Sequence, residues 1–227
     1  MAGLVYHDDA NEISPKNEGV DINVEIARLD QDASRFYRKG EYSNSVEVLR
    51  HSYNLRSSFL GKTHVDSLTN LNNLAAALGR AGFKNEAEKA FRDALIGRMN
   101  TKGKENKDTY TTMSHLGVVL KQLGQFEEAE ALLYTSLEGF HKLYGVDHVC
   151  TSEVAFSYGV LSVQQGKRNK AAYCFSVAVI GLSCALGTAH QHTQDAISWM
   201  EKCRDTYNAG SSNDINSGNI NNNSKNN

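Results

Sequence analysis

The sequence predicts an all-α fold, a right-handed superhelical solenoid of stacked helix hairpins. Glycine recurs every 42 residues in two interleaved sets, and small residues keep the same period. A fixed period of this length is the signature of an array in which each unit packs on its neighbours. The glycines are Gly40, Gly82, Gly124 and Gly166, then Gly61, Gly103, Gly145 and Gly187. The small residues are Ser45, Ala87, Ala129 and Ala171, then Ser52, Ala94, Ser136 and Ala178.

The apolar spacing inside each unit is helical on both sides of the first glycine. Leu71, Leu74 and Leu78 recur at intervals of three and four residues before Gly82, and a second helical pattern runs from Ala87 onward. Glycine accepts the left-handed backbone that ends a helix, so each unit reads as helix, tight turn, helix. Polar pairs before each first helix are expected as N-caps: Asp66-Ser67, Asp108-Thr109, Thr151-Ser152 and Thr193.

These patterns divide the chain into an array with two flanking segments. Residues 1–23 form an acidic lead-in that we expect to be flexible, and residues 208–227, rich in asparagine and serine, are expected to be disordered. The array occupies 24–207 and ends in a capping helix with Ile197, Met200 and Cys203 on one side. Its units are 24–65, 66–107, 108–150 and 151–192, followed by the cap at 193–207.

Composition and charge argue against several classes of function. The 227 residues include 40% hydrophobic and 22% charged residues, and the formal net charge is −2. Nucleic-acid or membrane-surface binding would favour a marked basic excess, which is missing. No apolar run approaches the roughly 18–20 residues that span a bilayer, and the N-terminal segment does not resemble a signal peptide. We expect a soluble cytoplasmic protein whose four cysteines are buried small hydrophobic residues.

The internal pattern decides between repeat families. A period of 42 falls in the HEAT and armadillo range, whereas the common tetratricopeptide period is about 34. However, the tetratricopeptide A-x₃-F signature appears at Ala87-x₃-Phe91 and Ala171-x₃-Phe175. The segment from Leu60 to Ala75 resembles the 42-residue tetratricopeptide repeats of kinesin light chains, which carry an L-G-x-x-H-x-x-T linker and an N-N-L-A first helix. The linker recurs at 144–151 and 186–193. The resemblance implies a concave groove that binds short acidic cargo peptides containing tryptophan.

Catalytic and metal-binding motifs are weak. Gly61-Lys62-Thr63 looks like the end of a P-loop, but Arg56 stands where the first glycine belongs and a helix precedes it. No catalytic residue, cofactor or metal is predicted. One alternative stays open, a small metal- or ligand-responsive protein that uses His190, His192 and Cys184. We expect His190 to bond the loop backbone instead, since the same linker histidine stands at His64 and His148.

The predicted binding surface is the concave face of the first helices. The basic residues Arg38, Arg80 and Lys121 lie near the same end of successive first helices and should form a basic rim. Phe156 and Val160 place an apolar patch on the same face, which suits the apolar anchor of an acidic peptide. The capping helix or a second copy of the chain would be the other occupants of this patch.

Polar side chains on this face are candidate contacts to a peptide backbone. Asn72 and Asn73 carry carboxamides that both donate and accept hydrogen bonds, and Ser114 takes the place of Asn72 one unit later. The predicted function is a non-catalytic scaffold or adaptor that binds a protein or peptide partner. We expect it to bind neither nucleic acid nor a membrane. A self-associating structural adaptor, with contacts through the Phe156 patch, is the other alternative.

Overall fold

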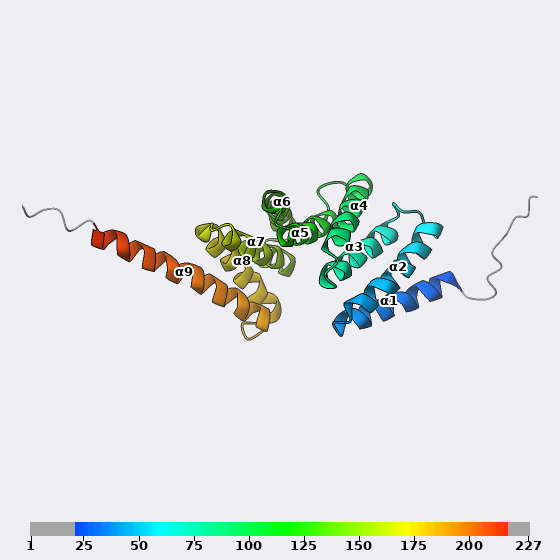
Figure 1. The fold of residues 1–227 in the computed structure, drawn as a ribbon, viewed down its shortest axis with the longest axis horizontal. Coiled ribbons are helices and arrows are strands. Elements are labelled where there is room, and N and C mark those ends of the chain that lie inside the picture. Colours follow the sequence, from blue (N-terminus) through cyan, green and yellow to red (C-terminus); the bar gives the residue numbers. More distant parts are fainter. Residues whose placement is uncertain (1–20, 218–227) are drawn as a thin grey trace, which may run out of the picture.

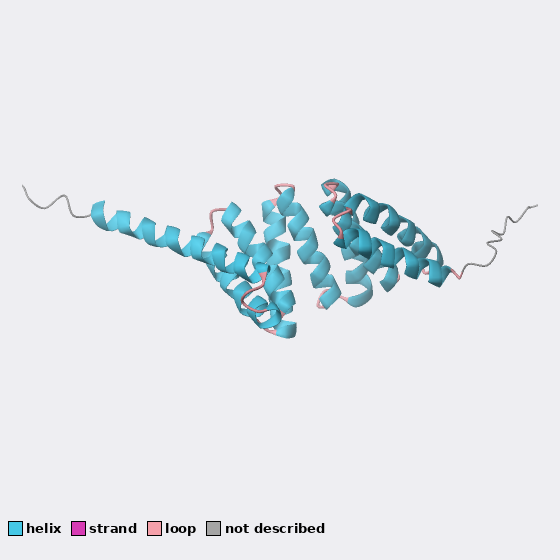
Figure 2. Ribbon diagram, turned by 90° about the horizontal axis from the view of Figure 1, so that it is seen from below, coloured by secondary structure: helices cyan, strands magenta, loops and turns pink. Residues whose placement is uncertain are grey.

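The computed structural model describes residues 21–217, and the side chains of residues 21–204. This part of the chain contains helices and turns and no strand. The helices follow one another in an elongated array, with the two described ends at opposite extremes (Figures 1 and 2). Their bounds are α1 Ile22–Arg38, α2 Tyr42–Phe59, α3 Val65–Arg80, α4 Lys84–Lys102, α5 Lys107–Gln122, α6 Phe126–Tyr144, α7 Val149–Gln164, α8 Arg168–Leu186 and α9 Gln191–Ser217.

Each helix packs on the next one in the chain, and α5 also touches both α3 and α7. The hairpins are therefore α1–α2, α3–α4, α5–α6 and α7–α8, as the 42-residue period predicts. All eight periodic small residues at the hairpin contacts are completely buried, and Phe91 and Phe175 of the A-x₃-F signature are buried beside them. Small side chains let two helices approach closely while the aromatic ring fills the remaining space.

The periodic glycines form every turn between α1 and α9. All eight have positive φ, between 73° and 93°. At the α3–α4 turn, the N–H of Gly82 donates to the carbonyl of Gly79 and that of Phe83 to the carbonyl of Leu78, at 3.3 and 2.9 Å. These bonds satisfy carbonyls at the end of α3, and they need the left-handed residue that glycine supplies most easily.

The predicted N-caps were wrong by two or three residues. The caps are His64, Asn106 and His148, whose side chains accept the N–H of the residue two positions later at 3.2, 2.9 and 3.2 Å. His190 does the same at 3.2 Å. The linker histidines thus order the loop backbone, as expected. The threonines of the predicted caps bond backward instead: the Oγ1 atoms of Thr109, Thr151 and Thr193 donate to the carbonyls of Gly103, Gly145 and Gly187.

A second glycine set, which the sequence analysis did not use, lies inside the second helices. Gly97, Gly139 and Gly181 are again 42 residues apart, and each faces a side chain of the first helix in its own hairpin. A Cβ at Gly139 would stand 2.2 Å from the ring of Tyr110, and one at Gly181 would stand 2.1 Å from Ser152 Oγ. These positions have no room for a side chain because two helices cross there at close range.

Both ends of the array differ from the predicted boundaries. Helix α1 begins at Ile22 with Asp21 as its N-cap, so the lead-in ends two residues before the predicted boundary, and residues 1–20 lie outside the described part. Helix α9 runs to Ser217 and thus enters the segment expected to be disordered. Once a helix is nucleated, each added residue gains one hydrogen bond, so a packed helix can continue past its contacts. Figure 1 shows this end of α9 projecting from the array.

Helix α8 is more apolar than the sequence analysis recognised. Among the described residues it is the one helix that length and composition would allow to cross a membrane. Its neighbours account for part of this apolar character, because α8 packs between α7 and α9. Core helices of soluble proteins pass the same test, so this is weak evidence for a membrane span.

Candidate functional site

The predicted binding residues lie on the first helices, but half of them stand one position away from the exposed stripe of their helix. The exposed stripe of α3 is Thr69, Asn73, Ala76 and Arg80. We call this stripe and its equivalents in the other first helices the first-helix face. The equivalents 42 residues away are Ala27, Gln31, Ser34 and Arg38 on α1, Thr111, His115, Val118 and Gln122 on α5, and Glu153, Ser157, Val160 and Gln164 on α7.

Asn72 was expected to contact a peptide backbone but is buried between two units. Its Oδ1 accepts a hydrogen bond from Thr112 Oγ1 of α5 at 3.2 Å, and only 5% of the residue is exposed. Thr112 in turn accepts a bond from the guanidinium of Arg98 at 2.6 Å. Asn72 therefore stabilises the contact between the second and third hairpins.

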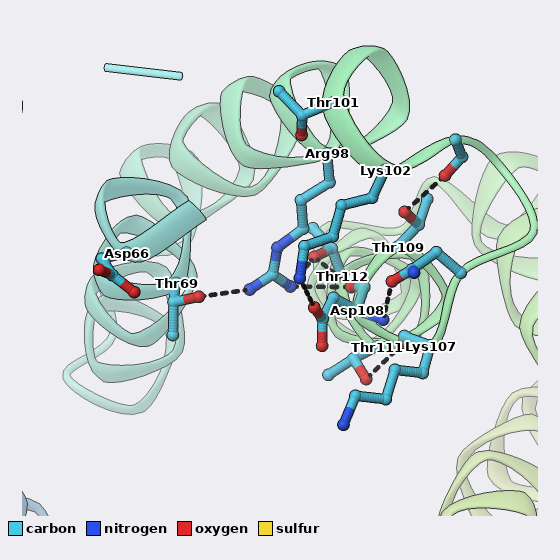
Figure 3. A network of polar contacts seen from close by, with 12 residues as sticks. Asp66, Thr69, Arg98, Thr101, Lys102, Lys107, Asp108, Thr109, Thr111 and Thr112 are labelled. Carbon is cyan, nitrogen blue, oxygen red and sulfur yellow. Dashed lines mark hydrogen bonds and ion pairs between the residues drawn. The ribbon is translucent and has the colours of Figure 1, made fainter. Parts of the chain in front are cut away.

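Arg98 is the centre of this buried network, which Figure 3 shows from close by. It leaves α4 and reaches between α3 and α5, where it donates to the carbonyl of Asp108 at 2.8 Å and to Thr69 Oγ1 at 3.4 Å. Burial lowers its pKa and the nearby Asp108 opposes that shift. Lys102 bonds the Asp108 carboxylate, so the cations of the network have a counter-charge. The arrangement joins neighbouring units through Arg98.

Ser114 and Lys121 are less exposed than the residues of the first-helix face were expected to be. Ser114 is buried, and its hydroxyl donates to the carbonyl of Thr111 in its own helix at 2.9 Å. Lys121 is half-buried and has no carboxylate within ion-pair distance among the described residues. Burial lowers the pKa of its ammonium group. The basic rim thus consists of Arg38 and Arg80, both exposed.

Three of the remaining predicted residues belong to one end of the array. A cavity of about 720 Å³ lies between α1 and α3, and both Arg38 and Asn73 line it. Tyr37 packs edge-on against Tyr42 in its wall, with ring centroids 5.2 Å apart. Arg80 lies in the last turn of α3, at the position equivalent to Arg38 in α1. The full lining is Asp30, Ala33, Ser34, Tyr37, Arg38, Ser45, Leu49, Asn73 and Ala76.

The one carboxylate in this cavity is already neutralised. Asp30 accepts two bonds from the Arg56 guanidinium, at 2.9 and 2.5 Å, and one from Ser52 Oγ at 3.0 Å. The hydrogen bond to Asp30 raises the pKa of Arg56 against the opposing effect of burial. Within residues 21–204, Arg38 makes one hydrogen bond, to the carbonyl of Ser34 in its own helix at 3.3 Å. The cavity therefore presents an excess positive charge to a ligand.

The predicted apolar anchor at Phe156 and Val160 is covered by the cap. Trp199 and Met200 of α9 pack with these two residues around the buried Phe175. The Phe175 ring stacks on Trp199 and meets Phe156 edge-on, at centroid distances of 5.8 and 5.6 Å. Helix α9 thus occupies the place of the first helix of a fifth hairpin. The capping helix, one of the occupants considered above, therefore covers the apolar patch of Phe156 and Val160.

His115 is the feature of this face that the sequence analysis missed. It stands 42 residues after Asn73, and its Nδ1 is buried without a hydrogen-bond partner. The ring lies 5.7 Å from that of Phe91. Burial, with a smaller contribution from the charge of Arg98, lowers its pKa to about 4. The repeat register identifies it as the residue at the Asn73 position, but the register does not show its burial.

The alternative metal site has no supporting geometry. His190 caps α9, and the His190 and His192 rings meet edge-on with centroids 5.8 Å apart. Cys184 is exposed. Within the described residues, no group of three or more His, Cys, Asp or Glu side chains is placed to hold a metal ion.

Stacked helix hairpins with glycine turns and small residues at the crossings define this protein as an α-solenoid of repeats. Two tetratricopeptide repeat family models match the chain, one over residues 108–179 and one over 68–98. Residues 68–98 and 108–179 are therefore tetratricopeptide repeats. None of the curated proteins matches the sequence.

Solved structures agree with this fold at low sequence identity. A crystal structure of the nearly identical TPR-like repeats of a putative kinesin light chain from Podospora anserina superposes with a TM-score of 0.70 at 16% identity, over 84% of this chain and 90% of that chain. A second structure of those repeats gives 0.67 at 18% identity, over 81% and 89%. BtubC (BKLC) from P. vanneervenii gives 0.59 at 16% identity, over 92% and 97%. Repeats of this class are in general protein-interaction scaffolds rather than enzymes.

Proposed function

We propose that the cavity between α1 and α3, together with the basic rim of Arg38 and Arg80, binds an acidic peptide segment of a partner protein. The observation that carries the proposal is the cavity itself, which is large enough for one or two side chains. Its own carboxylate is paired with Arg56, whereas the guanidinium of Arg38 has no acidic partner among the described residues. Bidentate recognition by arginine suits carboxylates well. The kinesin light chains that these repeats resemble bind acidic, tryptophan-containing peptides.

Each wall of the cavity has a role in this proposal. Arg38 and Arg80 attract the acidic side chains of the peptide, and the exposed amide of Asn73 bonds its backbone. Tyr37 and Ala76 offer apolar contact to the anchor residue. The protein then acts as a cytoplasmic scaffold or adaptor, and the C-terminal part of the first-helix face is closed by α9.

The test is the double charge reversal Arg38→Glu with Arg80→Glu. The probe is a fluorescein-labelled peptide with one tryptophan between glutamates, and fluorescence anisotropy measures its affinity. We expect at least a tenfold loss with unchanged helicity, because both residues are exposed. Lys62→Glu with Lys89→Glu is the control, since it makes the same charge change at exposed residues outside the cavity. Equal affinity of both double variants would contradict the proposal.

A further inference from the structure

A row of ion pairs joins the second helices of successive hairpins, and we call it the ladder. Arg50 of α2 pairs with Glu86 of α4, and Arg92 of α4 pairs with Glu128 of α6. The second pair is bidentate, with both bonds at 2.7 Å, and these bonds lower the pKa of the Glu128 carboxyl. The arginines are 42 residues apart, and so are the glutamates. The same contact thus recurs at two successive steps of the array.

At the third step both members of the pair change. The position of the arginine is taken by Tyr134 of α6 and that of the glutamate by Lys170 of α8. Lys170 turns to Glu130, which it bonds at 2.7 Å, and its ammonium group lies 5.5 Å from the centre of the Tyr158 ring. Lys167 bonds the same carboxylate at 2.6 Å, and these two bonds lower the pKa of Glu130 to about 2. No ion pair joins Tyr134 to Lys170.

A cavity of about 600 Å³ opens where the ladder is broken. We call it the tyrosine pocket, because Tyr134 and Tyr173 stand at its mouth, 53% and 63% exposed, and Tyr158 is at its base. Val177 of α8 and Leu137 of α6 supply apolar wall between them. Large side chains with this much exposed surface are a feature of contact sites. The pocket lies between second helices and shares no residue with the cavity between α1 and α3.

The charge of the pocket indicates the chemistry of its occupant. Glu127 and Glu138 line it and make no ion pair among the described residues, whereas Glu130 is neutralised by its two lysines. Glu127, Tyr134 and Glu138 are seven and four residues apart, so they share one face of α6. A tyrosine ring flanked by free carboxylates favours a cation over an anion. Lys170 on Tyr158 shows that a cation already sits on one ring of this pocket.

We propose that the tyrosine pocket binds a basic side chain of a partner protein, an arginine or lysine next to an apolar residue, with the cation between Glu127 and Glu138 and against the rings of Tyr134 and Tyr173. This site is separate from the one proposed for acidic peptides. The chain would then hold two segments of opposite charge on its two faces.

The decisive variant rebuilds the ladder. Tyr134→Arg with Lys170→Glu restores at this step the pair found at the two preceding steps, so it should close the pocket while preserving the fold. The probes are acetyl-Phe-Arg-amide and, as the counterpart of opposite charge, acetyl-Phe-Glu-amide, titrated into the ¹⁵N-labelled full chain. We expect chemical-shift changes centred on α6 and α8, tighter binding of the arginine probe by at least tenfold, and at least a tenfold loss in the rebuilt variant.

Two further variants keep the outcome unambiguous. Glu127→Gln with Glu138→Gln removes the charge without closing the pocket, and it should weaken the arginine probe while leaving circular dichroism unchanged. Arg38→Glu with Arg80→Glu should leave binding of this probe unaltered, which separates the two proposed sites. Equal binding of both probes, shifts centred on α1 and α3, or full binding by the two pocket variants would each overturn the proposal.

Discussion

At the scale of single residues, the side chains of Arg98 and Asn72 show how the repeat positions are used. Arg98 stands 42 residues after Arg56, and Asn72 stands 42 residues after Asp30. In the first hairpin the pair is a direct Arg56–Asp30 bond, whereas in the second the amide and the guanidinium meet through Thr112. The same positions therefore serve contacts between helices in both units, and this explains why Asn72 is unavailable to a ligand.

His115 leads to a prediction on pH dependence. Its pKa is about 4 in the folded chain against 6.5 for an ordinary histidine. Between those values the unfolded chain binds a proton that the folded chain does not, so the free energy of unfolding should fall as the pH falls from 6.5 to 4. The loss is about 3 kcal/mol at most, at roughly 1.4 kcal/mol for each unit of pKa. Urea unfolding at a series of pH values measures it.

The variant His115→Asn separates this effect from other titrations. Asparagine stands at the equivalent position of the preceding unit, and it carries no titrating group. The variant should lose most of the slope between pH 6.5 and 4. The lowered pKa of Glu130 adds stability above about pH 4.5 that is lost as the pH falls toward 2, and both proteins share it. The same slope in both proteins between pH 6.5 and 4 would show that His115 is not its source.

At the scale of the helices, the second glycine set decides how closely each hairpin closes. Gly139 of α6 faces the buried ring of Tyr110 on α5, which itself packs against Phe140. Alanine is the better helix former by up to about 1 kcal/mol, so an exposed glycine would be improved by the change. Here a Cβ would stand 2.2 Å from the buried Tyr110 ring, so the ring or one of the two helices would have to shift.

We therefore expect Gly139→Ala to destabilise the protein by about 1–3 kcal/mol, the usual cost of overpacking. Thermal or urea unfolding followed by circular dichroism measures the change. Glu138→Ala is the matched control, because it places alanine at the neighbouring exposed position of the same helix. A Gly139→Ala protein as stable as this control would mean that α5 and α6 can separate without cost.

At the scale of the whole molecule, α9 closes an array that would otherwise expose its last apolar face. A chain that ends at His190 loses Trp199 and Met200 and leaves Phe156 and Phe175 uncovered. We expect a lower melting temperature and concentration-dependent self-association, because a terminal cap keeps a repeat array soluble. A chain that ends at Arg204 retains these contacts and is the control. Sedimentation at several concentrations distinguishes the two, and a monomeric His190 truncation with unchanged melting would contradict the prediction.

The sequence predicted the array well because its signals are periodic, and it predicted the surfaces less well because they are not. Gly82 and its equivalents identified the turns directly. The caps were misplaced because Asp66 and His64 are both capable of capping. The predicted contact at Asn72 was wrong because neighbouring positions of a helix differ in exposure: Asn73 lies on the exposed stripe, whereas Asn72 is buried. The tyrosine pocket was missed because it lies where the ladder of ion pairs is interrupted, and the ladder joins different hairpins. Arg92 and Glu128, which form one of its pairs, are 36 residues apart.

The 42-residue turn register also has a consequence for how such a chain can change its length. A segment inserted or removed within the array keeps every glycine at its turn only if it spans one whole hairpin. Removing residues 66–107 would join α2 to α5 through an intact turn at Gly61, but it would also delete Asn73, Arg80 and Arg92 in one step. Gene duplication and loss would then alter the ligand-binding faces by entire units, while point substitutions such as those at Tyr134 and Lys170 diversify each unit afterwards.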